Sequence, residues 1–299
     1  MSDLTLVDMT TTTSKSFSIG GDLPVRRIGY GAMRLTDSPE TRNGGAAHIW
    51  RPPTDRAAVI AVLRGAADLG VNLIDTADSY ALGANEELIA EALHPYGEDL
   101  VVATKIGNTR PGPQEWVPLG HPAYLRQQTE LSLRRLRVDR IDLLYLHRID
   151  PNVPLADQVG TLRQLREEGK VRHIGLSEVS VAELRAAMDI TPIAAVQNVY
   201  NLVARQHDAV LEFAAEHDIA FVPYFPVAMG EHARPDSPVA ALAKEIGATP
   251  AQVALAWLLR RSKTVVPIPG TASLTHLAEN IDALDITLSD DQFARLSAL

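Results

Sequence analysis

The chain has 299 residues, of which 46% are hydrophobic and 22% are charged, and its formal net charge is -9. This length allows one large hydrophobic core or two ordinary domains. The acidic balance argues against nucleic acid and against an anionic membrane as the main partner. Because the chain has no cysteine, disulfides, thiolate catalysis and cysteine-ligated zinc are excluded.

The N-terminal segment is polar, and we expect residues 1–15 to be irregular or disordered. It has neither the basic region nor the apolar core of a secretory signal. No apolar run approaches the length of about 18 residues that a membrane-spanning helix needs. These features predict a cytoplasmic protein without a membrane partner.

The first predicted element is a β-hairpin at residues 17–27. Phe17 and Ile19 precede a Gly-Gly-Asp turn, and Val25 follows it, which is the alternation of a half-buried hairpin. Short apolar segments with the character of buried strands then recur along the whole chain. They are residues 27–32, 72–77, 100–105, 142–147, 171–177, 193–198, 219–224 and 264–269.

Amphipathic helical patterns separate these strands. In residues 55–69, Val59, Leu63 and Ala66 form one apolar stripe, and Gly70 is a typical helix stop. The other predicted helices are residues 85–93, 122–136, 155–169, 181–188, 204–217, 237–246, 249–259 and 274–284.

Eight strand–helix pairs in a chain of this length predict an α/β fold, a (β/α)8 TIM barrel formed by residues 16–299 as a single catalytic domain. A doubly wound sheet is the alternative. The hairpin is expected to plug the bottom of the barrel. Two long loops, residues 34–54 and 106–121, follow the first and third strands and therefore lie at the C-terminal face, where barrel enzymes react.

Polar residues stand at the ends of three consecutive apolar strands. Asp75, Lys105 and His147 end the second, third and fourth strands, and Tyr80 follows Asp75 in the loop. Taken singly, each is more often a cap, a solvated side chain or a satisfied polar group. Their coincidence at one face predicts a catalytic site.

These four residue types suit acid–base chemistry at a carbonyl. A phenol titrates near about 10, and an adjacent ammonium lowers that pKa. A carboxylate keeps the lysine charged, and a neutral imidazole can hold a carbonyl oxygen. The set lacks a nucleophile and a metal cage, so we expect no metal and an external hydride donor. The segment GYGAMR (29–34) lacks the last glycine of a dinucleotide-binding fingerprint, so a Rossmann site is unsupported.

The sequence resembles the aldo-keto reductase family over nearly its whole length. The matching segments are IGYGAMRL, NLIDTADSYALGANEELIAEAL, VVATKIG, IDLLYLHRID, GKVRHIGLSEVS, AVQNVYNL, TPAQVALAWLL and PIPGTASLTHLAEN. The resemblance implies that Tyr80 is the proton donor, that Lys105 paired with Asp75 tunes it, and that His147 orients the carbonyl. It also implies a monomer or weak homo-oligomer that acts on a small-molecule carbonyl substrate.

The resemblance further implies a nicotinamide cofactor, NADPH/NADP+ rather than NADH. Ser177 and Gln197 match the residues that hold the carboxamide, and Tyr224 matches the aromatic residue that stacks on the nicotinamide. The other implied cofactor-binding residues are Gly31, Ala32, Met33, Asp75, Phe225, Pro226, Val227, Ile268, Gly270, Thr271, Ser273, His276, Glu279 and Asn280.

Three positions depart from the family pattern. Glu178 stands where many members have asparagine, and Gly270 and His276 replace cations that often bind the 2'-phosphate. The pattern is similar to members of the pyridoxal reductase or pyridoxine 4-dehydrogenase type, so a pyridoxal-like substrate is expected. Its implied contacts are Met33, Trp50, Tyr80, Trp116 and His147.

Two functions of other classes fit the same residues. One is a barrel aldolase or lyase that uses Lys105 as a Schiff base. The other is a non-catalytic binding module that senses the redox state of nicotinamides.

Overall fold

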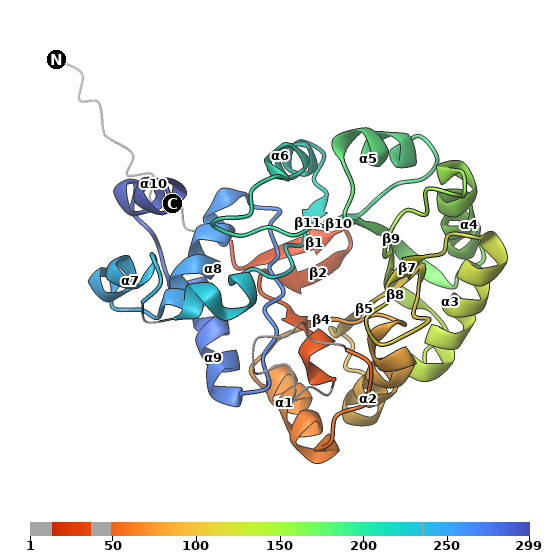
Figure 1. The fold of residues 1–299 in the computed structure, drawn as a ribbon, viewed down its shortest axis with the longest axis horizontal. Coiled ribbons are helices and arrows are strands. Elements are labelled where there is room, and N and C mark those ends of the chain that lie inside the picture. Colours follow the sequence, from red (N-terminus) through yellow and green to blue (C-terminus); the bar gives the residue numbers. More distant parts are fainter. Residues whose placement is uncertain (1–13, 37–48, 235) are drawn as a thin grey trace.

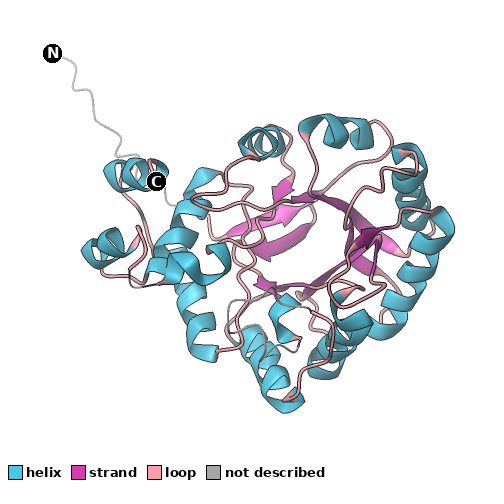
Figure 2. Ribbon diagram, viewed as in Figure 1, coloured by secondary structure: helices cyan, strands magenta, loops and turns pink. Residues whose placement is uncertain are grey.

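The computed structural model describes residues 14–36, 49–234 and 236–299. Residues 1–13 of the predicted irregular segment 1–15 and residues 37–48 of the predicted loop 34–54 therefore lie outside the described residues. Figure 1 shows a ring of helices around a central set of strands, and Figure 2 separates the two kinds of element by colour.

The N-terminal hairpin forms as predicted. Strands β1 (Ser16–Ile19) and β2 (Leu23–Arg26) pair antiparallel, with Ile19 opposite Leu23. Ile19, Leu23 and Val25 are buried in one apolar cluster with side chains of the barrel strands. Those partners include Leu73, Val101, Ala103, Leu143 and Tyr145. Since Asp22 contacts the start of strand β9, the hairpin covers the N-terminal end of the barrel.

The central sheet is parallel and its strands are neighbours in chain order, apart from the short hairpin β6–β7. Its strands are β3 (Tyr30–Gly31), β4 (Leu73–Asp75), β5 (Val101–Ile106), β8 (Ile141–Leu146), β9 (Val171–Ser177), β10 (Ala195–Gln197) and β11 (Ala220–Phe221). This order is that of a barrel, whereas a doubly wound sheet reverses direction at a switch point. The predicted barrel is therefore correct.

The eighth strand is reduced to hydrogen bonds that close the barrel. Carbonyl oxygens of residues 264–269 accept hydrogen bonds from both neighbouring segments. Phe221 N donates to Thr264 O at 2.9 Å, and Gly29 N donates to Pro267 O at 3.0 Å. Pro267 and Pro269 have no N–H group, so this segment cannot form a continuous ladder. The predicted strand is thus a bridging segment with one isolated pairing, between Phe221 and Val265.

The predicted helices form close to their predicted bounds. They are α1 (Arg56–Asp68), α2 (Ala84–Leu93), α3 (Pro122–Leu136), α4 (Leu155–Glu167), α5 (Val181–Met188), α6 (Asp208–Glu216), α7 (Ala240–Ile246), α8 (Pro250–Arg261) and α9 (Leu274–Asp282). Helix α10 (Asp290–Ser297) was not predicted, although Ser289 and Gln292 form a capping box at its start. The loop 106–121 contains the small hairpin of β6 (Asn108–Thr109) and β7 (Val117–Pro118).

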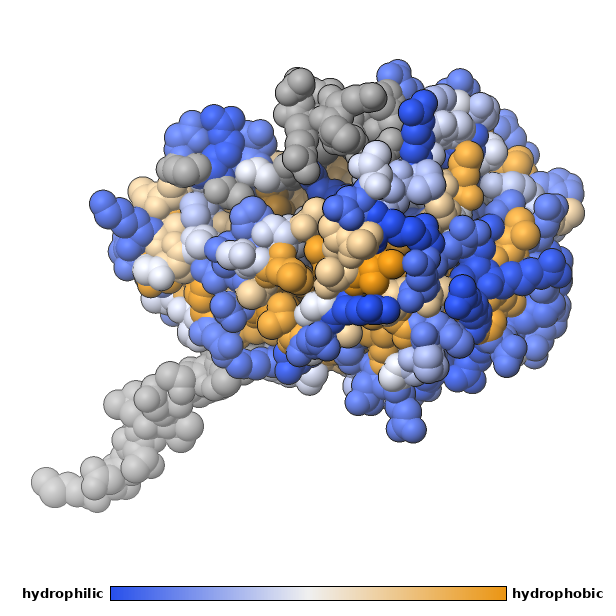
Figure 3. All heavy atoms as spheres, turned by 90° about the horizontal axis from the view of Figure 1, so that it is seen from below, coloured by the Kyte–Doolittle hydropathy of each residue, from blue (hydrophilic) through white to orange (hydrophobic). Residues whose placement is uncertain are grey.

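Hydrophilic side chains dominate the face seen in Figure 3, with a few apolar patches between them. Among the residues that the structure describes, no helix is both long and apolar enough to cross a membrane. The largest apolar cluster lies between the sheet and the outer helices and includes the fully buried Trp257 of α8. Apolar side chains therefore pack against the sheet from the outer helices and from the N-terminal hairpin. This packing fixes the ends of the strands that carry the candidate site.

Candidate active site

An ion pair is buried where strands β4 and β5 end. The Nζ of Lys105 lies 2.5 Å from Oδ1 of Asp75, and both side chains are almost fully buried. Lys105 also donates to the carbonyl oxygen of Thr76 at 2.7 Å. The Nε2 of Gln197, at the end of β10, donates to the second carboxylate oxygen at 2.8 Å. The pair therefore connects three strands across the top of the barrel.

The proton of this pair resides on Lys105. Burial alone lowers the pKa of the ammonium, but the charge of Asp75, the nearby Tyr80 and the hydrogen bond to Asp75 reverse that effect, so its pKa is raised. A charged lysine is thus available in a site that excludes water.

Tyr80 lies above this pair, on a sharply turned segment. Its ring centroid is 5.2 Å from Lys105 Nζ, and the side chain is 6% exposed. Ala81 and Leu82 both have positive φ values, 48° and 55°, before Gly83 continues the turn at 94°. Left-handed backbone costs a non-glycine residue roughly 1 to 3 kcal/mol. Ala81 N donates to Ile49 O at 2.9 Å, which helps to hold this turn.

The pKa of Tyr80 is raised, contrary to the direction predicted from the lysine. Burial raises it, and the charge of Lys105 opposes this only in part. The phenol is consequently protonated at neutral pH, while the adjacent ammonium lowers the free energy of the phenolate that proton donation produces. The neighbouring Asp78 is also buried, and burial raises its pKa well above the usual value.

His147 completes the group that the sequence predicted. It follows β8, its N–H donates to Ile106 O at 2.8 Å, and its Nδ1 lies 3.4 Å from the hydroxyl of Ser79. The imidazole packs edge-to-face on Tyr80, with 6.0 Å between ring centroids. Burial and the positive charges of Lys105 and two arginines hold the pKa of His147 well below its usual value, so the ring is neutral.

Trp116 forms an aromatic wall beside these two rings. Its centroid is 6.3 Å from that of Tyr80 and 6.1 Å from that of His147, both in edge-to-face geometry. Met33 packs against the same apolar cluster. Trp50, by contrast, reaches the wall through Arg110, whose guanidinium carbon lies 5.5 Å from its ring and 3.6 Å from that of Trp116.

Arg110 was not predicted as a functional residue. It is only 7% exposed, and its N–H groups donate to the main-chain oxygens of Ile49, Ser79, Pro113 and Glu115. These bonds connect three loops at the mouth of the barrel. The sequence carried no signal for this, because an arginine in a loop rich in glycine and proline resembles a solvated residue.

The residues predicted for the nicotinamide end lie beside the ion pair. Ser177 and Gln197 are register partners at the ends of β9 and β10. The hydroxyl of Ser177 accepts a hydrogen bond from Arg148 at 3.1 Å, which leaves its own O–H to donate. Tyr224 is hydrogen-bonded through its N–H to Asn198 O and contacts Phe225 edge-to-face.

Glu178 belongs to a polar network at the ends of β9 and β10. Its backbone is left-handed, with φ 57°, and its Oε1 accepts from Val199 N at 2.6 Å. Its other oxygen lies 3.5 Å from Nε2 of His207, whose Nδ1 contacts the amide of Asn198 at 3.0 Å. Burial raises the pKa of Tyr224, and the charge of Glu178 raises it further. The carboxylate therefore contacts His207 and acts electrostatically on Tyr224.

The residues predicted for the adenosine end are also brought together. A Cβ at Gly31 would lie 2.7 Å from Ile268 O, and one at Gly270 would lie 2.6 Å from Gly31 O, so both must be glycine. Ser273 caps α9, and the N–H groups of its first turn point out of the helix end. Thr271, His276, Glu279 and Asn280 lie on or before this helix, and Ala32 and Phe225–Val227 lie on the turns after β3 and β11.

Arg34 is a further cation at this end. A Cβ at Gly270 would lie 3.8 Å from the Arg34 side chain, and Arg34 is exposed. Among the described residues, no group of three or more histidine, aspartate or glutamate side chains could hold a metal ion.

A model of the Aldo/keto reductase family matches residues 27–299. The chain therefore belongs to the aldo/keto reductase family and is an oxidoreductase. It is 45% identical to an uncharacterized oxidoreductase of Schizosaccharomyces pombe, over 92% of this chain and 87% of that protein. It is 38% identical to the pyridoxine 4-dehydrogenase of Escherichia coli, over 96% and 99% of the two chains.

The fold agrees with that of a solved relative. The crystal structure of an aldo-keto reductase from Klebsiella pneumoniae in complex with NADPH matches with a TM-score of 0.77 and 29% sequence identity. The match covers 95% of this chain and 94% of that chain.

The lowered pKa of His147 predicts acid sensitivity of the fold. In the unfolded chain a histidine titrates near about 6.5, so below that pH the unfolded state binds a proton that the native state excludes. The free energy of unfolding should therefore fall as the pH decreases, with a slope from this group of up to about 1.4 kcal/mol per pH unit. In urea titrations across this range, His147→Gln should show a shallower slope than the unmodified protein; equal slopes would contradict the neutral imidazole.

Proposed function

We propose that the chain is an NADP(H)-dependent oxidoreductase that reduces an aldehyde or ketone to an alcohol, with residues 16–299 acting as one catalytic unit. The observation that carries this proposal is the buried Asp75–Lys105 pair beneath a protonated Tyr80 and beside a neutral His147. These groups can move one proton to a carbonyl oxygen, and they include no nucleophile or electron carrier of their own.

The residues present fit a dinucleotide cofactor. Two backbone segments approach each other at Gly31 and Gly270, where a Cβ would clash, and α9 begins a few residues later, with the N–H groups of its N-terminal end suited to a phosphate. At the other end, Ser177 can donate and Gln197 can accept, as a carboxamide requires. Bound NADPH supplies the hydride that reduces the carbonyl carbon.

The chain's own groups then handle the proton. Tyr80 donates its hydroxyl proton to the substrate oxygen, and the ammonium of Lys105 stabilises the resulting phenolate. Asp75 keeps Lys105 protonated and fixed. The neutral His147 donates a hydrogen bond that orients the carbonyl oxygen. A charged imidazolium would instead compete with Tyr80 as the proton donor. Trp116 and Arg110 exclude water from this space.

NADPH is favoured over NADH by two side chains at the adenosine end. His276 lies in the first turn of α9, and Arg34 passes beside Gly270 from the opposite segment. We propose that these two residues bind the 2'-phosphate, with Arg34 supplying the positive charge that the sequence lacks at position 270. The NADPH complex of the Klebsiella pneumoniae relative supports this cofactor.

The alternative functions have less support. A Schiff-base lysine must be neutral to attack a carbonyl, whereas the pKa of Lys105 is raised and its ammonium makes two hydrogen bonds. A binding module that only senses nicotinamides needs no proton donor, yet Tyr80 is held over Lys105 by a strained turn.

For the substrate we propose an aromatic aldehyde of the pyridoxal type. The edge-to-face rings of Trp116, Tyr80 and His147 form a wall suited to a flat ring. The relative named pyridoxine 4-dehydrogenase supports the same class of substrate.

The cofactor and the proton donor can be tested together. NADPH should quench tryptophan emission and bind more tightly than NADH, and the enzyme should then reduce aldehydes. Tyr80→Phe should lower kcat by about 100- to 10,000-fold while the NADPH affinity is retained, because only the proton donor is removed.

Tyr96→Phe is the matched control, since the Tyr96 hydroxyl bonds to Leu136 O on the outer helix layer. It should leave kcat unchanged. Absence of quenching by either cofactor would refute the reductase, and an undiminished rate in Tyr80→Phe would refute only the assigned donor.

The aromatic wall predicts substrate preference. Pyridoxal should be reduced with a higher kcat/KM than benzaldehyde or propanal. Trp116→Ala should raise KM for pyridoxal by about tenfold, the equivalent of about 1.4 kcal/mol, and should affect propanal much less. A pyridoxal efficiency no better than that for benzaldehyde would count against this substrate.

We also propose that Glu178 accepts a hydrogen bond from the Tyr224 hydroxyl and so positions the Tyr224 ring. Glu178→Gln and Tyr224→Phe should each weaken NADPH binding by about three- to tenfold, since each removes one side of a charge-assisted hydrogen bond. Because both changes break the same contact, the double variant should be no weaker than the worse single variant. NADPH affinity is measured by fluorescence titration. Deuterium transfer from NADPH labelled on either face of the nicotinamide measures which face delivers hydride, and a loosened Tyr224 ring should make this choice of face less selective. Effects that multiply in the double variant would show that the two residues act independently.

A further inference from the structure

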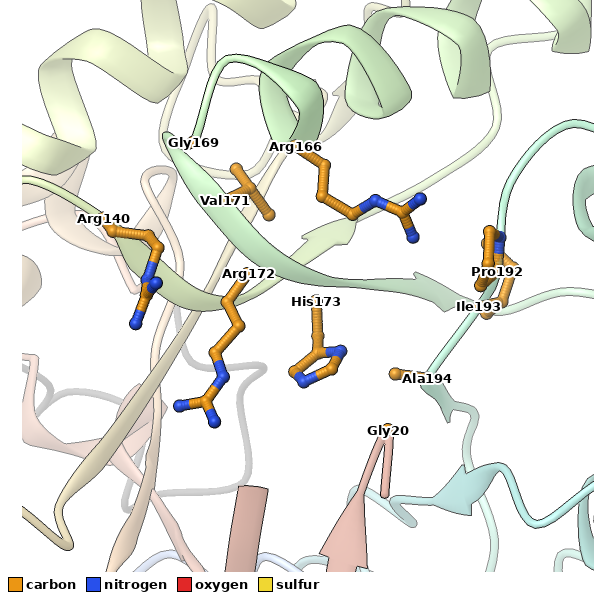
Figure 4. A pocket seen from close by; sticks show the side chains of 10 residues that line it. All are labelled: Gly20, Arg140, Arg166, Gly169, Val171, Arg172, His173, Pro192, Ile193 and Ala194. Carbon is orange, nitrogen blue, oxygen red and sulfur yellow. The ribbon is translucent and has the colours of Figure 1, made fainter. Parts of the chain in front are cut away.

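A hollow lies at the opposite end of the barrel from Tyr80. It has a volume of about 500 Å³ and is bounded by the hairpin turn at Gly20 and by the N-terminal ends of strands β8 and β9. Figure 4 shows Arg140, Arg166, Arg172 and His173 projecting around it. None of the residues assigned to the active site lines this hollow.

One side of the hollow is held rigid by Asp22. Its carboxylate accepts from Nη2 of Arg172 at 3.0 Å and lies 2.6 Å from Nε2 of His173. Gly20 sits directly against the His173 ring, because a Cβ there would lie 2.2 Å from the ring carbon Cε1. The hairpin turn and the start of β9 therefore form one preorganised wall.

The hollow carries an excess of positive charge. Within the described part of the chain, the side chains of Arg140 and Arg166 have no hydrogen bond or ion pair, although Arg140 acts electrostatically on Asp142, which is also 3.9 Å from Arg172. Three guanidinium groups thus face two carboxylates, in a chain whose net charge is -9. Arg166 belongs to the last turn of α4, and Arg140 precedes β8, so the two come from different elements.

The remaining wall is apolar. Val171, Ile193 and Ala194 line it and are themselves buried, and Pro192 forms its exposed edge. A ligand that fits must therefore combine an anionic group with a small apolar body. The volume lies within the range of roughly 300 to 1,000 Å³ that is usual for small-molecule sites.

We propose that this hollow binds a small organic phosphate, with Arg166 on the phosphate, Val171 and Ile193 against its apolar part, and Arg140 adding positive charge from the other side of strand β9. Guanidinium groups bind phosphate oxygens in pairs and are weakly hydrated, so they suit a partly exposed anion site. A phosphate monoester carries about -1.5 to -2 charges at neutral pH, so the excess of positive charge in the hollow favours it over a monocarboxylate.

Calorimetric titration with phenyl phosphate, benzoate and benzyl alcohol at constant ionic strength tests the proposal. Phenyl phosphate should bind with one-to-one stoichiometry, benzoate more weakly, and benzyl alcohol not measurably. The double variant Arg140→Gln/Arg166→Gln should bind phenyl phosphate at least about tenfold more weakly. The double variant Arg134→Gln/Arg163→Gln removes the same charge from exposed positions of α3 and α4 and should bind like the unmodified protein.

Arg140→Lys/Arg166→Lys keeps the charge but loses paired hydrogen bonding, so it should show a smaller loss and serves if the glutamine variant does not fold. The proposal is overturned if phenyl phosphate does not bind, if the Arg140 and Arg166 variants bind it normally, or if benzoate binds as tightly. Saturating NADPH should not displace phenyl phosphate, because the cofactor residues lie at the other face. The titration does not depend on the reductase activity, so the failure of one proposal leaves the other intact.

Discussion

The buried pair of Asp75 and Lys105 is the constraint on which the site depends. Removing two charges from water costs several kcal/mol for each ion, and their attraction offsets this only when every remaining donor and acceptor is satisfied. Thr76 O and Gln197 meet that condition here. Because the pair and these partners come from β4, β5, β10 and the residue after β4, the strands can satisfy the pair only when the barrel has closed around it.

Tyr80 and His147 respond to this pair and to burial in different ways. Burial keeps the proton on the phenol and removes it from the imidazole, since it disfavours the charged form of each. The ammonium of Lys105 opposes burial at Tyr80 and adds to it at His147. One residue is thereby left as a proton donor whose anion is stabilised, and the other as a neutral hydrogen-bonding group.

The parts of this arrangement that depend on local pattern could be predicted from the sequence. Strand ends follow from apolar runs, so Asp75, Lys105 and His147 were placed at one face, as the barrel has them. Arg110 could not be found in this way, because its partners Ile49 and Ser79 are distant in sequence and are main-chain oxygens. The direction of the Tyr80 pKa shift was wrong for a related reason: burial depends on the whole fold, whereas the lysine was visible in the sequence.

Net charge was a poor guide to local electrostatics, because the fold decides which charged groups lie close together. The chain is acidic overall, yet cations gather at both ends of its barrel. At the catalytic end, Lys105 and Arg110 are buried and their charges are held by Asp75 and by carbonyl oxygens, so they act on neighbouring groups. At the other end, Arg140 and Arg166 are accessible to solvent in whole or in part and, among the residues that the structure describes, make no hydrogen bond through their side chains. A buried cation with a complete set of acceptors tunes the chemistry beside it, whereas an accessible cation without them is suited to bind an anion from solution.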